Sequence, residues 1–423
     1  MANDITRFTR KLMDGVIEAF ESERTISKTV NTALLSDAFG KGTGATVDFP
    51  RPTDFVSQRT SQGDVSGGTD GDIITGKATA TVQDYITVPM NFQEADQALN
   101  MGGSAEQDFY KSAARRIVTD LEIDFAAFAL KNTALLAGTP GTAVSTWAEV
   151  ANAGALMRSA GVPSGDWYYN GNPFLQSSLA DIQRSLGAVD SLVSPAFRDA
   201  TLSNNFAGFK VMTADALATV TTGAMADKVG TLSATPTLTY TAAKDSMTQE
   251  LAVAGMTNNA VIKAGEIIQV TGRNRLNLAT RQPMLNAAGA QVLWTATVTA
   301  DVTLSGTGTG TLVCTGPAIF ESGGAYNTTS TALASGDVVT MLYPASAVTQ
   351  ANLFYHKDAF GIGSVPIDKL FSTDTLGTTE DGLQIRCSKG ADISKNKQIV
   401  RFDLRPAYSA LNPFFAGQGF GTP

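Results

Sequence analysis

Histidine and cysteine are almost absent from this chain of 423 residues, which contains one histidine and two cysteines. A metal site built on several histidines is therefore impossible, and any nucleophile activated by histidine would have to use His356. The surrounding stretch, NLFYHKDAF, carries no nucleophile motif, so we expect a structural histidine. Cys314 and Cys387 lie far apart in the sequence, which favours a reduced chain over a disulfide scaffold.

Charge is also scarce. Charged residues make up 17% of the chain, against about 25% in an average globular protein, which suggests a surface partly covered by other chains. The formal net charge is −8, and no basic run is longer than Arg10–Lys11 or Arg115–Arg116, which argues against tight direct binding to DNA. No stretch approaches the roughly 18 apolar residues of a membrane span, and the first 20 residues lack the apolar core of a signal peptide.

The Gly-rich stretch GDIITGKAT at 71–79 is one residue short of a phosphate-binding loop. Gly71, Gly76 and Lys77 fit that motif, but Ala78 stands where a hydroxyl should reach the magnesium ion. A β-alternating run follows Lys77, so a phosphate would find no helix N-terminus. Asp70 and Asp72 have the spacing of a calcium loop, but no Glu follows at the required position. We predict no catalytic residue, no cofactor and no metal, and therefore no enzyme.

Helical periodicity is clear in two places. Apolar residues recur at helical spacing over 4–22, and this helix could pack on its own domain or reach a neighbour as an arm. A second helix of some eight turns is predicted over 104–133, with a capping box at Ser104 and Gln107. Its expected buried stripe consists of Phe109, Ala113, Ile117, Leu121, Phe125 and Phe128. A second capping box, at Thr146 and Glu149, predicts a further helix that ends near Gly161.

Two regions have a β pattern. Residues 48–92 predict a long two-stranded hairpin with a wide tip rich in Gly, Asp and Ser. From about 223 to 349 charged residues become rarer and Thr more frequent, and short β runs such as TPTLTYTAA and QVLWTATVTADV alternate with turns. This texture, set inside a mixed α/β chain, predicts an inserted all-β barrel or sandwich with its own core. The alternative is a set of β excursions packed on the parent domain.

Three landmarks together resemble the major capsid (coat) proteins of short-tailed phages, and match most closely the group related to phage P22. They are the hairpin RPTDFVSQRTSQGDVSGG…ITGKATATVQDYITV, the helix RIVTDLEIDFAAFALKN, and the pair NLFYHKDAFGIGSVPIDKL and VRFDLRPAYSALNPFFAGQGFG. The resemblance covers nearly the whole chain. The inserted region matches by position and texture more than by residue identity.

The resemblance implies an α+β chain with the Hong Kong 97-type capsid fold and an insertion. Its expected parts are an N-terminal arm (1–46), the extended E-loop hairpin (47–93), a peripheral domain with a long spine helix (94–145 and 396–423), an axial domain (146–222 and 350–395) and the inserted β domain (223–349).

The same resemblance implies a function. Hexamers and pentamers of the chain would form an icosahedral phage head, assembled in the bacterial cytoplasm with a scaffolding protein and a portal protein. The shell would enclose double-stranded DNA without sequence-specific binding and expand later. An encapsulin-like cellular compartment on the same fold is the alternative.

Six residues are candidates for contacts between subunits. The hairpin tip has too few apolar side chains to bury itself, so we expect it to lie over a neighbouring subunit. Arg51, Asp54, Arg59 and Asp64 are the candidates for ion pairs there. In the inserted domain, the polar turn at Lys244 and Asp245 is the candidate contact tip.

Overall fold

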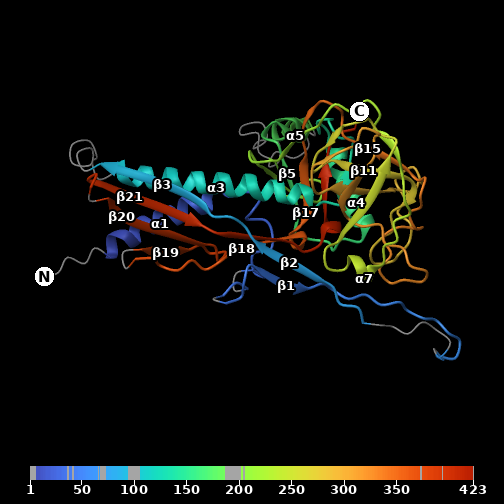
Figure 1. The fold of residues 1–423 in the computed structure, drawn as a ribbon, viewed down its shortest axis with the longest axis horizontal. Helices are drawn as coiled ribbons and strands as arrows, with labels where there is room; N and C mark the ends of the chain where they lie inside the picture. The colour runs from blue at the N-terminus through green and yellow to red at the C-terminus, as the bar shows by residue number, and fades with distance from the viewer. Residues whose placement is uncertain are drawn as a thin grey trace. The chain divides into compact units, whose positions relative to one another are not determined.

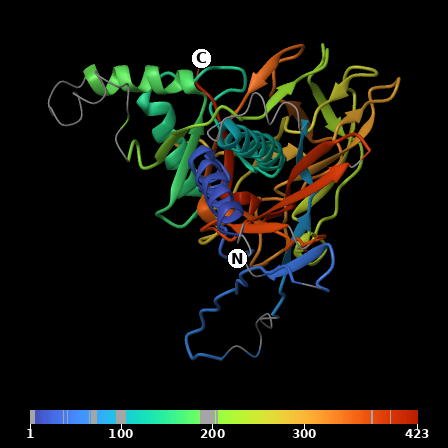
Figure 2. The same cartoon turned by 90° about the vertical axis from the view of Figure 1, so that its left-hand side faces the viewer.

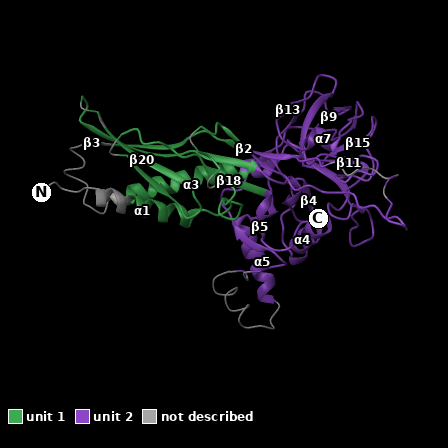
Figure 3. Ribbon diagram, turned by 90° about the horizontal axis from the view of Figure 1, so that it is seen from below, with its two compact units in different colours: residues 1–47, 80–126, 360–409 green, residues 48–79, 127–359, 410–423 purple. Residues whose placement is uncertain are grey.

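The computed structural model describes residues 6–35, 38–40, 42–64, 66, 73–93, 105–185, 202, 205–371, 374–392 and 394–422. The chain forms two compact units, each assembled from three separate stretches (Figure 3). Unit 1 consists of residues 1–47, 80–126 and 360–409, and unit 2 of residues 48–79, 127–359 and 410–423. The capping residue Ser104 and the acidic pair Asp70 and Asp72 lie outside the described residues.

Unit 1 is built on an antiparallel sheet of four strands, in which strands from the second and last parts of the sequence pair. In sheet order they are β19 (Thr375–Thr378), β20 (Gln384–Asp392), β21 (Lys397–Leu404) and β3 (Ile86–Gln93). A second sheet lies mainly in unit 1, with the order β1 (Thr46–Pro50), β2 (Lys77–Val82), β22 (Pro406–Ala410) and β18 (Phe360–Ser364).

Two helices cover the strands of unit 1. The helix α1 (Thr6–Glu23) packs on β19 and buries Val16 and Phe20, so it packs on its own unit. The long helix α3 (Ala105–Lys131) runs along the sheet of β21 and β3 (Figure 1). Within unit 1 it places Tyr110 edge-on against Phe402, with the ring centroids 5.7 Å apart.

Two expectations for unit 1 were wrong in detail. The run after the hairpin tip is two strands, because β2 pairs with β22 whereas β3 leaves the hairpin and forms an eight-residue ladder with β21. Phe109 is not part of the buried stripe of α3, since 48% of it is exposed. Its neighbour Tyr110 faces the sheet instead. Phe128, on the part of α3 that belongs to unit 2, is only partly buried.

Unit 2 contains a five-stranded sheet flanked by helices. In sheet order its strands are β4 (Leu135–Ala137), β23 (Ala416–Gly419), β17 (Asn352–His356), β5 (Trp167–Gly171) and β6 (Lys210–Thr213). The helices α4 (Trp147–Ala160) and α5 (Pro173–Ser185) contribute to its core, and the short 3-10 helices are η1 (Lys357–Ala359) and η2 (Pro413–Phe415). The capping box predicted for Thr146 and Glu149 is present at the start of α4.

The region with the β texture contains a closed barrel of six strands, also in unit 2. Around the barrel they are β11 (Ile267–Asn274), β12 (Leu293–Val298), β14 (Gly310–Thr315), β9 (Thr248–Ala254), β8 (Val229–Leu232) and β15 (Val338–Met341). Its interior has its own cluster of buried side chains, among them Trp294, Leu312 and Val339. A small ribbon of β10 (Val261–Ile262) and β13 (Val302–Thr303) accompanies it.

The segments that lead into and out of the barrel region lie side by side, since β7 (Thr219–Thr221) pairs antiparallel with β16 (Val348–Gln350). The predicted fold class, an α+β chain with an inserted β barrel, is confirmed. One predicted β run is wrong: in TPTLTYTAA the described backbone forms the short helix α7 (Tyr240–Ala243). Leu238 and Tyr240 therefore belong to a separate apolar cluster with Tyr326 and Phe414.

Candidate functional site

The foot of the hairpin, where its two sides meet, is fixed by Arg51. The backbone N–H of Arg51 donates to the carbonyl of Gly76 at 2.8 Å and closes the loop. The guanidinium is buried and donates to three carbonyl oxygens, those of Lys77, Ala410 and Leu411. Burial lowers the pKa of Arg51 to about 10 because the charged form loses its hydration. Arg51 therefore anchors the hairpin to its own subunit.

Asp54 forms the next contact along the hairpin. Its carboxylate accepts from Arg281 Nη2 at 2.7 Å, and its backbone N–H donates to the hydroxyl of Tyr326 at 2.8 Å. The same hydroxyl donates to the carbonyl of Ile74 on the other side of the hairpin, and its ring stacks on Tyr240 with the centroids 3.6 Å apart. Both sides of the hairpin are thus tied to α7 and its surroundings.

Lys244 and Asp245, the polar turn after α7, also contact the foot of the hairpin. Lys244 Nζ donates to the carbonyl of Thr75 at 3.2 Å, and Asp245 accepts from the backbone N–H of Lys77 at 3.1 Å. A Cβ added to Gly76 would lie 2.6 Å from the carbonyl oxygen of Lys244, so only glycine permits this approach. Four of the six candidate residues therefore come together around one point of unit 2.

Beyond its foot the hairpin continues as the long blue loop of Figure 2. By sequence, Arg59 and Asp64 belong to this extended part and not to the foot. Arg59 is exposed and makes no ion pair with any described residue, and Asp64 accepts hydrogen bonds from Ser66, two residues further along. Large apolar side chains on the same segment face solvent: Phe55 is 56% and Ile73 is 72% exposed. The described part of the hairpin beyond its foot thus finds little to pack against in its own chain.

Beneath the foot of the hairpin lies a cavity of about 280 Å³. Its polar lining includes Arg51, Asp54 and Arg281, and its apolar lining includes Tyr326 and Phe414. Both guanidinium groups already have partners, and no nucleophile with an activating base lines it among the described residues. The arrangement joins chain segments that are far apart in the sequence.

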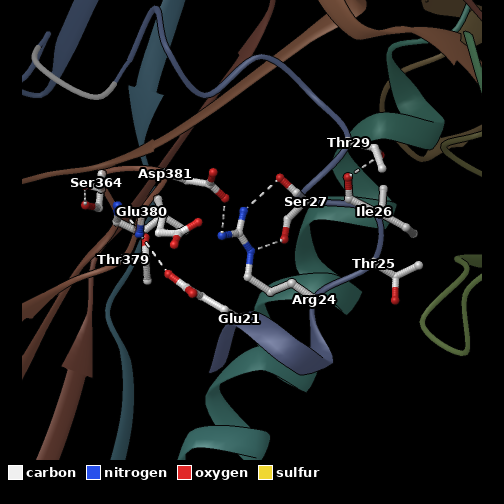
Figure 4. A network of polar contacts seen from close by, with 12 residues as sticks. Glu21, Arg24, Thr25, Ile26, Ser27, Thr29, Ser364, Thr379, Glu380 and Asp381 are labelled. Atoms are coloured by element: carbon white, nitrogen blue, oxygen red, sulfur yellow. Dashed lines mark hydrogen bonds and ion pairs between the residues drawn. The ribbon is translucent and has the colours of Figure 1, made fainter. Parts of the chain in front are cut away.

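A second polar network, in unit 1, was not predicted from the sequence (Figure 4). Arg24 at the end of α1 donates to Asp381 Oδ2 at 2.8 Å, and also to the hydroxyl and carbonyl of Ser27. Glu122 of α3 accepts from the backbone N–H groups of the same turn, at 2.8 Å from Ile26, and from the Ser27 hydroxyl. These contacts join residues some 100 and 350 positions apart, so no local sequence pattern predicts them.

The histidine and the two cysteines, which the sequence leaves as possible reactive groups, are all buried. His356 is buried, its Nδ1 accepts from the backbone N–H of Asp358 at 3.1 Å, and burial lowers its pKa. Cys314 and Cys387 are buried free thiols. Across the described ranges, no group of three or more His, Cys, Asp and Glu residues could hold a metal ion. No helix within those ranges is both long and apolar enough to cross a membrane.

Comparison with known proteins gives two full-length sequence matches. The family described as P22 coat protein, gene protein 5, matches residues 1–421. The major capsid protein of Acyrthosiphon pisum secondary endosymbiont phage 1 is 34% identical over 427 residues, which covers 100% of both chains.

Solved phage structures match over similar lengths but more weakly. A chain of Mycobacterium phage Che8 has a TM-score of 0.45 at 11% identity, covering 93% of this chain and 90% of that one. The capsid structure of cyanophage P-SCSP1u has a TM-score of 0.42 at 12% identity, with coverage of 90% and 84%.

Proposed function

The chain belongs to the P22 coat protein family and is a phage major capsid protein, and on that premise we propose that its copies assemble as hexamers and pentamers of an icosahedral head around double-stranded DNA. The observation that carries the proposal is the match of the whole chain, 34% identical from end to end, to one phage major capsid protein. The encapsulin-like alternative is not favoured.

The proposal also assigns each segment of the chain to a part of the capsid protein. Residues 1–46 act as the N-terminal arm, 47–93 as the E-loop, and 223–349 as the inserted domain. Residues 94–145 with 396–423 form the peripheral domain, and residues 146–222 with 350–395 the axial domain. The closed barrel and the ribbon of β7 and β16 support the placement of the inserted domain.

The hairpin supplies the contacts between subunits in this proposal. Arg59 and Asp64 are exposed on its extended part, which supports a role in ion pairs with a neighbour. Arg51 and Asp54 have partners within the chain and hold the hairpin foot in place for that contact. Lys244 and Asp245 support the foot from the side of the barrel, and any contact they make with a neighbour is additional.

The proposal also includes partners other than copies of the same chain. A scaffolding protein guides assembly in the cytoplasm of the host bacterium, a portal protein occupies one vertex, and the shell expands as DNA enters. The net charge of −8 suits a wall that DNA must slide past, because a basic lining would retain the phosphates. The chain itself has no catalytic role.

Expression with and without the neighbouring scaffold gene product tests the proposal. Negative-stain microscopy of the purified particles should show closed shells of uniform size with the scaffold, and irregular shells, sheets or tubes without it. A protein that stays monomeric in both cases, while folded by circular dichroism, would contradict the assembly role. Particles filled with a cellular enzyme instead of DNA would favour the encapsulin-like alternative.

A further inference from the structure

A buried arginine in the barrel wall has no acidic partner. Arg275 follows β11 and is 3% exposed, yet it forms no ion pair with a described residue. Its Nη2 donates to the carbonyl oxygens of Ala134 at 2.8 Å and Thr295 at 2.7 Å. A buried guanidinium without a counter-charge is costly, because it has lost its hydration and gained only neutral acceptors.

The other donors of Arg275 are unused. Among the described residues, neither Nε nor Nη1 has a hydrogen-bond partner, which leaves three N–H groups without an acceptor. Burial lowers the pKa of this guanidinium to about 10, so it remains charged at neutral pH. Neither nitrogen is among the fully enclosed side-chain atoms that lack a partner, so both remain open to the adjoining space and can donate to a ligand there.

Arg275 lines a cavity of about 150 Å³ where the barrel meets β4 and α4 of its parent domain. Apart from Arg275, the polar side chains of the described lining are Gln269 and Thr295, and no Asp or Glu is among them. Gln269 makes no side-chain hydrogen bond to a described residue, so its amide is available as a second donor. The pairing of β11 with β12 shifts register between Gln269 and Asn274, and both donors flank that irregularity.

We propose that this cavity is a binding site for a small oxyanion, such as inorganic phosphate or a small carboxylate, held by Arg275 and Gln269. Oxyanions fit because guanidinium and amide N–H groups both donate to their oxygens, and because a positive group in a site of low polarity attracts them strongly. Since the lining comes from β11 and β12 on one side and from β4 and α4 on the other, the anion would fasten the barrel to its parent domain.

Thermal unfolding of the purified full-length chain tests the site, with inorganic phosphate, acetate and chloride as probes at matched ionic strength. A ligand that binds only the folded state raises the melting temperature as its concentration rises. Phosphate also stabilises proteins generally by exclusion from their surface, so the informative quantity is the difference between variants. We expect the phosphate-dependent rise of wild type to exceed that of Arg275→Met, and the acetate series to show whether a carboxylate serves as well.

The matched control is Arg273→Met. Arg273 lies two residues away on β11 and already has a bidentate partner in Asp337, at 2.6 and 2.7 Å. This variant should lose stability but keep the full response to phosphate. An equal response in wild type, Arg275→Met and Arg273→Met would overturn the site.

A second variant covers the case in which Arg275→Met does not fold. Gln269→Leu removes one donor and leaves the buried charge in place, and should weaken phosphate binding several-fold. Line broadening of the phosphorus resonance of inorganic phosphate measures that binding directly. Broadening by wild type and Arg273→Met, reduced by Gln269→Leu, supports the site; no broadening by folded wild type would contradict it.

Discussion

The barrel and the hairpin of this chain make opposite use of their apolar side chains. In the barrel, Trp294, Val298 and Leu312 are fully buried in a core that the barrel strands close around. On the hairpin, Phe55 and Ile73 are more than half exposed, and contacts within the chain are concentrated at its foot. A chain whose copies form a shell can thus keep folding and assembly in separate regions.

The difference has a physical reason. A closed barrel satisfies its backbone hydrogen bonds and leaves no free edge, so its stability needs no partner. A long loop gains order only by burying surface, and the described part of this loop has little of its own chain to bury against. Substitutions in the barrel core should therefore lower the stability of the monomer strongly, whereas changes to the hairpin should affect assembly.

The largest loss of stability is expected for Trp294→Ala. The indole is fully buried and its Nε1 donates to the carbonyl of Gly316 at 3.1 Å. We expect a loss of about 3–5 kcal/mol in the free energy of unfolding, measured with urea on the full-length chain. The control Phe55→Ala, on the hairpin, should change stability by less than about 0.5 kcal/mol. Similar losses in both variants would contradict the difference between the barrel core and the exposed hairpin.

Acid should weaken the parent domain of the barrel through Glu149. Its burial raises the carboxyl pKa, but hydrogen bonds from the N–H groups of Thr422, Ser145 and Thr146 outweigh this and lower the pKa from 4.5 to about 2. A lowered folded-state pKa adds stability above about pH 4.5 that is lost as the pH falls toward 2. Glu149→Gln should therefore lower the free energy of unfolding by on the order of 2–3 kcal/mol at pH 7. This difference from wild type should shrink as the pH is lowered.

The control for that experiment is Asp181→Asn, which removes an exposed pair with Arg184 on α5. Such pairs contribute about 0–1 kcal/mol, so its stability curve should follow that of wild type closely. A constant difference between wild type and Glu149→Gln from pH 7 down to pH 2 would show that the lowered pKa does not contribute to stability.

At the foot of the hairpin, Arg51→Met should have a smaller effect. It leaves three carbonyl oxygens without their donor, at a cost of about 1–3 kcal/mol, and should speed proteolysis of the loop between 52 and 76. Arg59→Met, further out on the same hairpin, is the matched control and should leave both quantities unchanged in the monomer. Equal cleavage rates for the two variants would remove Arg51 from its anchoring role.

The smallest effect is expected for the pair of Asp54 and Arg281. Asp54 is 44% exposed in its side chain, so the ion pair should contribute about 0–1 kcal/mol. A double-mutant cycle with Asp54→Asn and Arg281→Met isolates that coupling. A coupling of several kcal/mol would mean that the hairpin foot depends on this pair more than on Arg51.

How much of this was visible in the sequence depends on the distance between partners. The periodicity of α3, the capping box at Thr146 and the texture of the barrel are local patterns, and each was predicted. The switch of β3 to a sheet with β21 was missed because its partner strand lies some 300 residues later. The contacts of Asp54 with Arg281, and of Glu122 with the turn at Ser27, were missed for the same reason, because their partners are far apart in the sequence.

Deletion of residues 62–72 tests whether folding and assembly lie in separate regions of the chain, because it shortens the hairpin tip without touching its foot. Assembly with the scaffold, followed by sedimentation velocity and negative-stain microscopy, gives the readout, and thermal unfolding of the monomer is the control. We expect monomers of the deleted chain to melt like wild type but to form no closed shells. Normal shells from the deleted chain, or a monomer that no longer folds, would contradict the separation of folding from assembly.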